Sequence, residues 1–211
     1  MTAPAAALVF VVDDDPSVRK GLTRLIKAAG HEVEAFASAR DFLARPPHDG
    51  PCCLVLDVRM PGLTGPELQE MLVSTGRRLS IIFITGHGDV RTGVNAMKGG
   101  AVDFLIKPVN DRELLGAIER CVDGARQAWW DRAEATELQD RIKTLTPREA
   151  QVFALVVTGM LNKQVAAELG ISEKTVKVHR ARVMEKMRAG SVAELVRLAD
   201  RGGVIAAKSS A

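Results

Sequence analysis

Several kinds of residue and segment are scarce in this 211-residue sequence. It contains no tyrosine, 6 Phe and 2 Trp, so its hydrophobic cores must rest mainly on aliphatic side chains. No apolar run reaches the ~20 residues that a membrane-spanning helix needs. The first apolar run, residues 8–12, is short and follows no basic segment, which is unlike a secretory signal. We therefore expect a cytoplasmic protein that does not engage a membrane.

Cysteine is also rare. Cys52, Cys53 and Cys121 form an odd-numbered set that lacks the spacing of metal ligands. Cys52 and Cys53 are adjacent, so in a strand their side chains would point to opposite faces. The simplest interpretation is three small buried hydrophobic side chains in a reducing cytoplasm rather than a redox site.

Charge is distributed unevenly along the chain, although the net charge is only +3. Residues 1–125 carry 14 basic and 16 acidic side chains, and residues 146–211 carry 11 basic and 6 acidic ones. The basic excess therefore lies in the last third, where a polyanion could bind. The length itself suits two small domains.

The first 125 residues alternate between short apolar runs and amphipathic stretches. Near-continuous apolar strands are typical of a parallel sheet covered on both faces, and five successive strand–helix units predict a doubly wound α/β fold with a five-stranded parallel sheet. Asp15 is expected to cap the first helix and Gly30 to close it. The predicted strands are residues 8–12, 32–36, 53–56, 81–84 and 104–106, and the helices are 17–29, 39–43, 65–74, 90–99 and 112–125.

The remainder of the chain is predicted to be helical. The pattern that starts at Arg112 can continue toward Ile142, which gives a semi-rigid helical linker over residues 126–143. Within it, Trp129 and Trp130 could pack on one domain or contact both, and the sequence favours neither. Residues 144–211 then form a small all-α, four-helix domain. Thr146 opens its first helix with a capping box, and that helix is expected to end near Gly159. The other helices are predicted at residues 162–169, 173–187 and 192–201.

Polar side chains follow four of the five predicted strands. The carboxyl ends of parallel strands meet at one edge of a sheet, so these side chains are expected to converge. Clustered carboxylates repel unless a cation joins them, and their oxygen donors suit Mg²⁺. A carboxylate beside a metal and a lysine can attack a phosphoryl group. The residues are Asp13, Asp14 and Asp15 after the first strand, Asp57 after the third, Thr85 after the fourth and Lys107 after the fifth.

The predicted helix over residues 173–187 is strongly basic, with Glu185 as its single internal acid. A short helix and a glycine-containing turn precede it, which is the layout of a helix-turn-helix whose second helix enters the DNA major groove. Basic side chains along the helix and directly after it are Lys174, Lys177, Arg180, Arg182, Lys186 and Arg188. Lys177, Val178 and Ala181 are expected to reach base edges, whereas Arg180, Arg182 and Lys186, with Asn162 and Lys163 on the preceding helix, are better placed for phosphates.

Residues 7–125 resemble bacterial response-regulator receiver domains, which have a flavodoxin-like fold. The motifs are Val12-Asp13-Asp14-Asp15, Leu56-Asp57-Val58-Arg59-Met60-Pro61-Gly62, Ile84-Thr85-Gly86-His87-Gly88 and Lys107-Pro108. The resemblance implies that Asp57 is the phosphoacceptor and that Asp13, Asp14, Asp57 and the Arg59 backbone carbonyl hold Mg²⁺. It also implies that Thr85 and Lys107 contact the phosphoryl group, that Lys107–Pro108 is cis, that Phe104 moves with Thr85, and that residues 90–118 form a dimerisation face.

Residues 144–201 resemble the LuxR-type output domain, and the whole chain resembles transcriptional regulators of the FixJ/NarL class. The matching stretches run from Leu145 to Glu149, from Asn162 to Ala166 and from Ile171 to Arg180. The implied partners are double-stranded DNA, a histidine kinase, a second copy of the chain on phosphorylation, and RNA polymerase. The DNA-contacting candidates are Asn162, Lys163, Lys174, Thr175, Lys177, Val178, Arg180, Ala181 and Arg182.

Two other functions fit parts of the sequence. Phosphatases with an Asp nucleophile also use Asp, Thr and Lys in this order, but they usually need a second carboxylate two residues after the nucleophile. Arg59 occupies that position here, so we expect no enzyme activity beyond slow self-dephosphorylation. A constitutive DNA binder with a vestigial acidic site is the second alternative, and the intact acidic set disfavours it.

Overall fold

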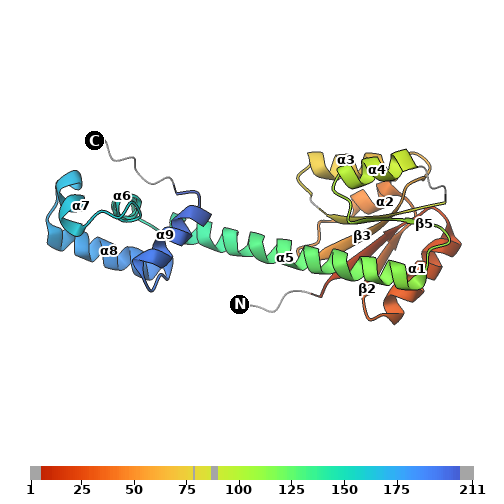
Figure 1. Cartoon of the computed structure of the whole chain (residues 1–211), viewed down its shortest axis with the longest axis horizontal. Coiled ribbons are helices and arrows are strands. Elements are labelled where there is room, and N and C mark those ends of the chain that lie inside the picture. Colours follow the sequence, from red (N-terminus) through yellow and green to blue (C-terminus); the bar gives the residue numbers. More distant parts are fainter. Residues whose placement is uncertain (1–5, 78, 87–89, 205–211) are drawn as a thin grey trace. The chain divides into compact units, whose positions relative to one another are not determined.

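In the computed structural model, which describes residues 6–77, 79–86 and 90–204, the chain divides into two compact units, Met1–Trp130 and Asp131–Ala211. Figure 1 shows the elements of both. No helix in the described ranges is long and apolar enough to cross a membrane. In chain order the elements are β1 (Leu8–Val12), α1 (Pro16–Ala28), β2 (Glu32–Phe36), α2 (Ala39–Ala44), β3 (Cys52–Asp57), α3 (Gly65–Ser74), β4 (Ser80–Thr85), α4 (Val90–Lys98), β5 (Asp103–Ile106), α5 (Asp111–Lys143), α6 (Pro147–Val156), α7 (Asn162–Leu169), α8 (Glu173–Met187) and α9 (Val192–Arg201).

The first unit is a five-stranded, all-parallel sheet in the order β2-β1-β3-β4-β5. Helices α2, α3 and α4 cover one face, and α1 and α5 cover the other (Figure 1). The doubly wound fold expected from the alternating pattern is therefore confirmed. Strands β1 and β3 are buried along their whole length because they lie inside the sheet, whereas the edge strand β2 is largely exposed.

Strand register brings the carboxyl ends of the strands level with one another. Val12 pairs with Leu56, and Asp57 pairs with Ile84 on the neighbouring strand. Thr85 in turn pairs with Ile106, one residue before Lys107. The polar residues that follow these strands consequently reach a single edge of the sheet.

Helix ends form at the residues that the sequence indicates. The Asp15 carboxylate accepts hydrogen bonds from the amides of Ser17 and Val18 and caps α1. Thr146 and Glu149 form the reciprocal capping box at the start of α6. Gly170 ends α7 in the left-handed conformation, which a glycine adopts without steric cost.

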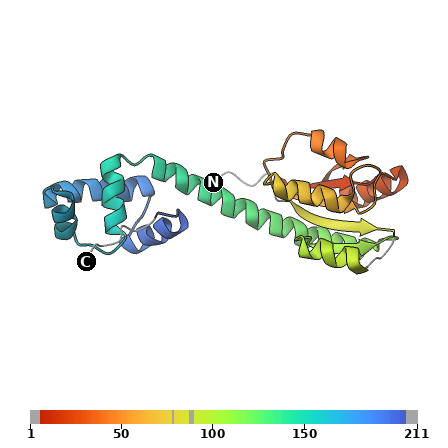
Figure 2. The same ribbon diagram turned by 90° about the horizontal axis from the view of Figure 1, so that it is seen from above.

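Helix α5 is continuous over 33 residues and contributes to both units, as Figure 2 shows. Its first half packs Leu114 against the sheet, and near its C-terminal end Leu138 is buried in the core of the second unit. Trp129 donates from Nε1 to the Asp49 carbonyl (2.7 Å) and stacks edge-on against Trp130. The two tryptophans thus belong to the first unit, and the predicted linker, residues 126–143, lies within α5.

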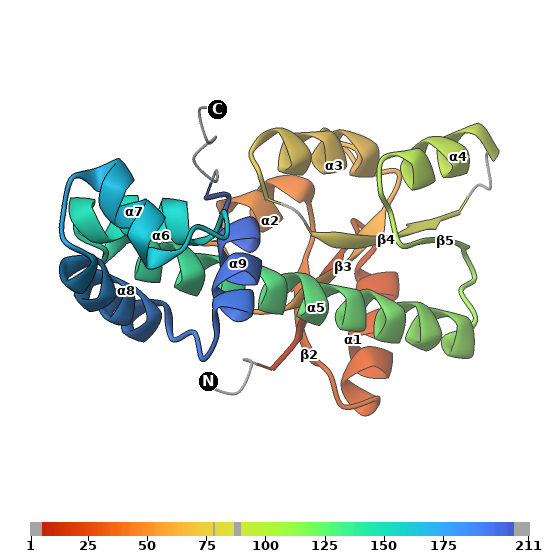
Figure 3. The ribbon, with the colours of Figure 1, turned by 60° about the vertical axis from the view of Figure 1, so that its left-hand side comes forward.

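The second unit consists of α6, α7, α8 and α9 with the last turns of α5 (Figure 3). Val176, Val183 and Met187 on α8 are buried in its core, together with Leu195 on α9. Burying one face of α8 leaves the opposite face for solvent or a ligand.

The cysteines require a correction. All three are buried, as expected for small hydrophobic side chains, but Cys53 on β3 and Cys121 on α5 are joined by a disulfide. Cys52 lies outside this bond and packs in the cluster on the other face of the sheet. The sequence shows no such pairing because Cys53 and Cys121 are 68 positions apart and meet only when α5 covers the sheet.

Candidate functional site

Three carboxylates converge at the carboxyl edge of the sheet. Asp13, directly after β1, and Asp57, at the end of β3, are buried, whereas Asp14 is exposed to solvent. One oxygen of each lies within 4.8 Å of the others, and within the described residues they are the group with the spacing of a metal site. Hard oxygen donors at this spacing, open to water on one side, fit the preference of Mg²⁺ for few protein ligands and several waters.

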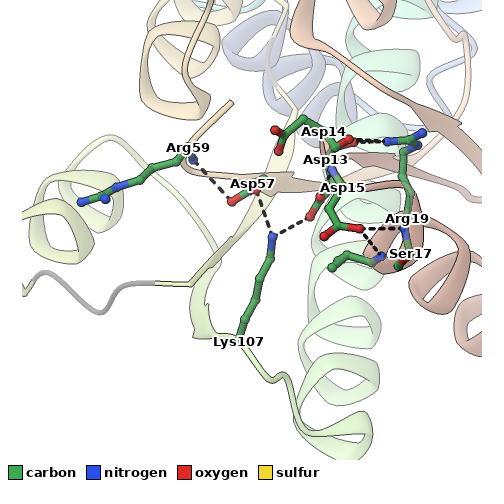
Figure 4. A network of polar contacts seen from close by, with 9 residues as sticks. Asp13, Asp14, Asp15, Ser17, Arg19, Asp57, Arg59 and Lys107 are labelled. Atoms are coloured by element: carbon green, nitrogen blue, oxygen red, sulfur yellow. Dashed lines mark hydrogen bonds and ion pairs between the residues drawn. The ribbon is translucent and has the colours of Figure 1, made fainter. Parts of the chain in front are cut away.

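Lys107 lies between two of these carboxylates (Figure 4). From the end of β5 its Nζ donates to Asp13 Oδ2 at 2.7 Å and to Asp57 Oδ2 at 2.9 Å. The Lys107–Pro108 peptide bond is cis, as the resemblance implied. The ammonium group offsets part of the repulsion between two buried negative charges, which would otherwise be costly in this environment.

Ionisation of Asp57 is less favourable here than in a carboxyl exposed to water. Burial raises the pKa of Asp57 above its ordinary value, and the nearby Asp13 charge adds to that effect. The hydrogen bond from Lys107 and the more distant amide of Arg59, 3.4 Å from Oδ1, act in the opposite direction without cancelling the shift. Burial alone would lower the pKa of Lys107, but its hydrogen bonds to Asp13 and Asp57 outweigh burial and raise it, so the lysine is cationic.

The loop between β1 and α1 is held by a residue that sequence reasoning did not single out. Arg19 on α1 donates from Nη1 to the backbone carbonyls of Asp13 (2.7 Å) and Asp14 (3.0 Å). The amide of Asp15 donates to Asp13 Oδ1 at 2.9 Å and fixes the orientation of that carboxylate. The third aspartate of the run, Asp15, serves as the helix cap, which was its expected role.

Gly65 is a second residue that the sequence did not reveal as important. A Cβ atom at this position would overlap the backbone oxygen of Asp57 and touch the ring of Phe83. The first turn of α3 therefore approaches the end of β3 closely, and only glycine permits that approach. A glycine at the start of a helix is common, so its position in the sequence alone carried no signal.

Thr85 and Phe104, the two residues expected to move together, lie on the neighbouring strands β4 and β5. Thr85 is buried at the end of β4, and Phe104 is partly buried on β5. The Phe104 ring packs on α4, where a Cβ added to Gly93 would be 3.3 Å from ring atom Cδ1. His87 and Gly88, which complete the threonine motif, lie outside the described residues.

On α8, the face opposite the core presents the residues expected to contact DNA. Lys174, Thr175, Lys177, Ala181 and Arg182 are exposed, and Val178 has 46% of its surface exposed although it is apolar. An apolar side chain at this position could contact the methyl group of a thymine.

Other basic residues of this region have partners within the protein. Arg180 donates to Asn162 Oδ1 at 2.9 Å and so links α8 to the start of α7. Lys186 contacts the buried carboxylate of Glu149 at 2.6 Å and also donates to the Thr144 carbonyl. These bonds assign Lys186 a structural role within the second unit, not the phosphate contact expected from its charge.

Comparison with known proteins agrees with both units. Residues 9–119 match the family described as "Response regulator receiver domain", and residues 143–199 match "Bacterial regulatory proteins, luxR family". The chain belongs to the two-component response regulators that join a receiver domain to a LuxR-type DNA-binding domain.

Individual relatives cover nearly the whole chain. "Nodulation protein W" of Bradyrhizobium diazoefficiens is 50% identical over 97% of this chain and 90% of its own length. "Transcriptional regulatory protein FixJ" of the same organism is 44% identical over 93% of this chain and 96% of its own length. Among solved structures, the response regulator StyR superposes with a TM-score of 0.87 at 47% identity, covering 93% of this chain and all of that one.

Proposed function

We propose that this protein is a transcription factor switched by phosphorylation of Asp57, with a histidine kinase as the donor and with DNA binding by α8 as the output. The observation that carries the proposal is Lys107 Nζ placed between Asp13 and Asp57, at 2.7 and 2.9 Å, beside the exposed Asp14. This arrangement combines a nucleophilic carboxylate, a fixed cation and oxygen donors for a divalent ion at one sheet edge.

At Asp57 the proposed step is phosphoryl transfer. A carboxylate oxygen attacks the phosphorus of a phosphohistidine, the P–N bond breaks, and an acyl phosphate forms on Asp57. Lys107 neutralises charge on the transferred group, and the Thr85 hydroxyl donates to one of its oxygens. Asp13, Asp14, Asp57 and the Arg59 carbonyl would hold Mg²⁺, which supplies further neutralisation of the phosphoryl oxygens when it is bound.

The same site disfavours rapid hydrolysis. Arg59 stands two residues after Asp57, where an aspartyl-phosphatase would carry its general acid/base, and a guanidinium offers N–H donors but no acceptor for a proton. The phosphorylated state consequently persists, as a switch requires, and the protein is not an enzyme with turnover.

For the output, we propose that α8 enters the major groove. Lys177, Val178 and Ala181 read base edges, while Arg182 and Lys174 contact phosphates. Asn162 and Lys163, at the start of α7, lie where a helix N-terminus favours a phosphate, and the bond from Arg180 holds Asn162 in place. Thr175 completes the set at the first turn of α8.

Phosphorylation is proposed to act through dimerisation. Val94 and Met97 on α4 and Ile106 on β5 are large apolar side chains with 46%, 47% and 57% of their surface exposed. They lie within residues 90–118, and the Phe104 ring on β5 packs against α4 at Gly93. A second copy of the chain would cover this surface, and the dimer would bring two copies of α8 to paired half-sites on DNA. This binding takes place in the cytoplasm and allows contact with RNA polymerase.

The test compares wild type with Asp57→Asn, which keeps the side-chain shape and removes the charge and the nucleophile. Both are incubated with Mg²⁺ and acetyl phosphate, and DNA fragments of the source genome are selected on each. We expect one phosphoryl group on wild-type Asp57, dimerisation in sedimentation, and tighter DNA binding, with none of these in the variant. Equal DNA affinity with and without acetyl phosphate would refute the control of DNA binding by phosphorylation. Phosphorylation of the variant would refute the assignment of Asp57 as the phosphoacceptor.

A further inference from the structure

A buried cysteine pair connects the phosphoacceptor strand to α5. Cys53 lies on β3, the strand that ends at Asp57, and Cys121 lies on α5; their Cα atoms are 5.8 Å apart and their sulfurs are bonded. Backbone separations of roughly 4.4–6.8 Å accommodate a disulfide without backbone movement. The fold therefore places these two residues, 68 positions apart in the sequence, at a distance that allows a disulfide bond.

The surroundings accommodate the reduced pair as well. Cys121 Sγ lies 3.2 Å from the Ser80 carbonyl oxygen, so a thiol there has an acceptor for its proton. Cys53 and Cys121 are both fully buried in the cluster between the sheet and α5, among aliphatic neighbours that either form can pack against. In the reduced form the Cys121 thiol therefore keeps a partner for its proton in this buried setting.

We propose that Cys53 and Cys121 are a reversible thiol–disulfide pair, whose oxidation fixes α5 to the strand that carries Asp57. The oxidant is a low-molecular-weight disulfide such as glutathione disulfide. One cysteine thiolate attacks it and forms a mixed disulfide with release of one thiol; the second cysteine then attacks the bound protein sulfur and expels the other thiol. One oxidant molecule and two protein thiols give one protein disulfide and two small thiols, so atoms and electrons balance.

Burial of both sulfurs determines how this exchange proceeds. No thiolate is accessible while α5 lies on the sheet, so the oxidant reacts when that part of α5 opens locally. Once formed, the bond suppresses the openings that separate α5 from β3. The cysteine pair takes no part in phosphoryl transfer. If the proposed thiol–disulfide exchange were refuted, the proposed function of Asp57 would not be affected.

The first experiment tests bond formation in the full chain. The reduced protein is titrated with glutathione disulfide, both folded and during refolding from urea, then quenched with acid, denatured, alkylated and analysed by peptide mass. We expect the peptide containing Cys121 to become linked to the one containing Cys52 and Cys53. Since those two share a peptide, Cys52→Ala must retain the link and Cys53→Ala must lose it. Three alkylated thiols, or glutathione adducts without a link, in both arms would overturn the proposal.

The second experiment tests the restraint on α5. Amide hydrogen exchange over residues 111–130 is compared between oxidised and reduced wild type, with Cys52→Ala as the control that keeps the pair. Oxidation should slow exchange in this segment on the order of tenfold, because the openings of α5 away from β3 are removed. The effect should persist in Cys52→Ala and vanish in Cys121→Ala. Equal exchange in the two redox forms of wild type would refute the restraint.

Discussion

Replacing Lys107 with methionine removes the cation that two buried carboxylates share. Methionine keeps the length and apolar stem of the lysine, so the change tests charge rather than packing. In the native protein the Asp13 side chain is fully buried and that of Asp57 is 7% exposed, whereas the Lys107 side chain is 20% exposed. The variant thus leaves two buried carboxylates close to each other without the hydrogen-bond donor that they share.

The expected loss of stability is large for a single substitution. Removing one partner of a buried ion pair costs about 3–5 kcal/mol, and the partial exposure of Lys107 reduces this to about 2–3 kcal/mol for the first unit at neutral pH. That range corresponds to roughly 30- to 150-fold in the folding equilibrium.

Urea unfolding followed by tryptophan fluorescence measures the loss of stability of the first unit, which contains Lys107. Both tryptophans belong to the first unit, and Trp129 is bonded there to Asp49. In Lys107→Met the pKa of Asp57, already raised in the wild type, rises further because its hydrogen-bonded cation is gone. A carboxyl whose pKa is raised by folding lowers the stability of the folded state at every pH above its ordinary, unfolded-state pKa. The loss of stability in Lys107→Met should therefore shrink as the pH falls toward the ordinary range of an aspartate.

Asp57→Asn supplies the matched control. Without the second carboxylate, Lys107→Met should cost much less than it does in the wild-type background, and Asp57→Asn alone should be neutral or stabilising without Mg²⁺. If Lys107→Met were as stable as wild type at neutral pH without divalent ions, the two buried carboxylates could not be the repelling pair described above.

Three further outcomes follow from other parts of the structure. The hydrogen bonds from Lys186 and the Thr146 amide lower the pKa of Glu149 to about 2. The stability that Glu149 contributes is therefore complete above its ordinary pKa of 4.5 and is lost as the pH falls toward 2, and circular dichroism should show this acid sensitivity diminished in Glu149→Gln. Arg182→Gln should reduce the slope of log affinity for DNA against log salt by about 1, and an unchanged slope would remove its phosphate contact. Gly65→Ala should lower the urea midpoint and slow phosphorylation, whereas Gly86→Ala, where an added Cβ meets nothing, should change stability far less.

The sequence predicts this fold well because its signals are local. Most strand and helix bounds agree with the structure to within a residue. The exceptions are the last helix of the sheet region, whose continuation toward Ile142 the sequence already suggested, and the helix capped by Thr146, which was expected to end near Gly159 and ends at Val156. The convergence of Asp13, Asp57, Thr85 and Lys107 could also be predicted, since parallel strands place their carboxyl ends at one edge.

Contacts between distant residues could not be predicted in the same way. The bond from Cys53 to Cys121 depends on how α5 covers the sheet, and the ion pair of Glu149 with Lys186 depends on how α6 crosses α8. Arg19 shows the same limit, because an arginine on an amphipathic helix gives no sign that it will hold two backbone carbonyls. In each case the partner is selected by tertiary packing, which periodicity along the chain does not encode.

The continuity of α5 determines where this protein can be divided into fragments. Its final turns supply Leu138 to the second core, and Gln139 donates to the Gly202 carbonyl there. A DNA-binding fragment that began after Lys143 would lose both contacts and uncover an apolar face. A fragment that began at Asp131 would retain them, and its complement ending at Trp130 would keep the tryptophan pair intact. The natural point of division between the two functions is therefore inside a helix, not in a loop.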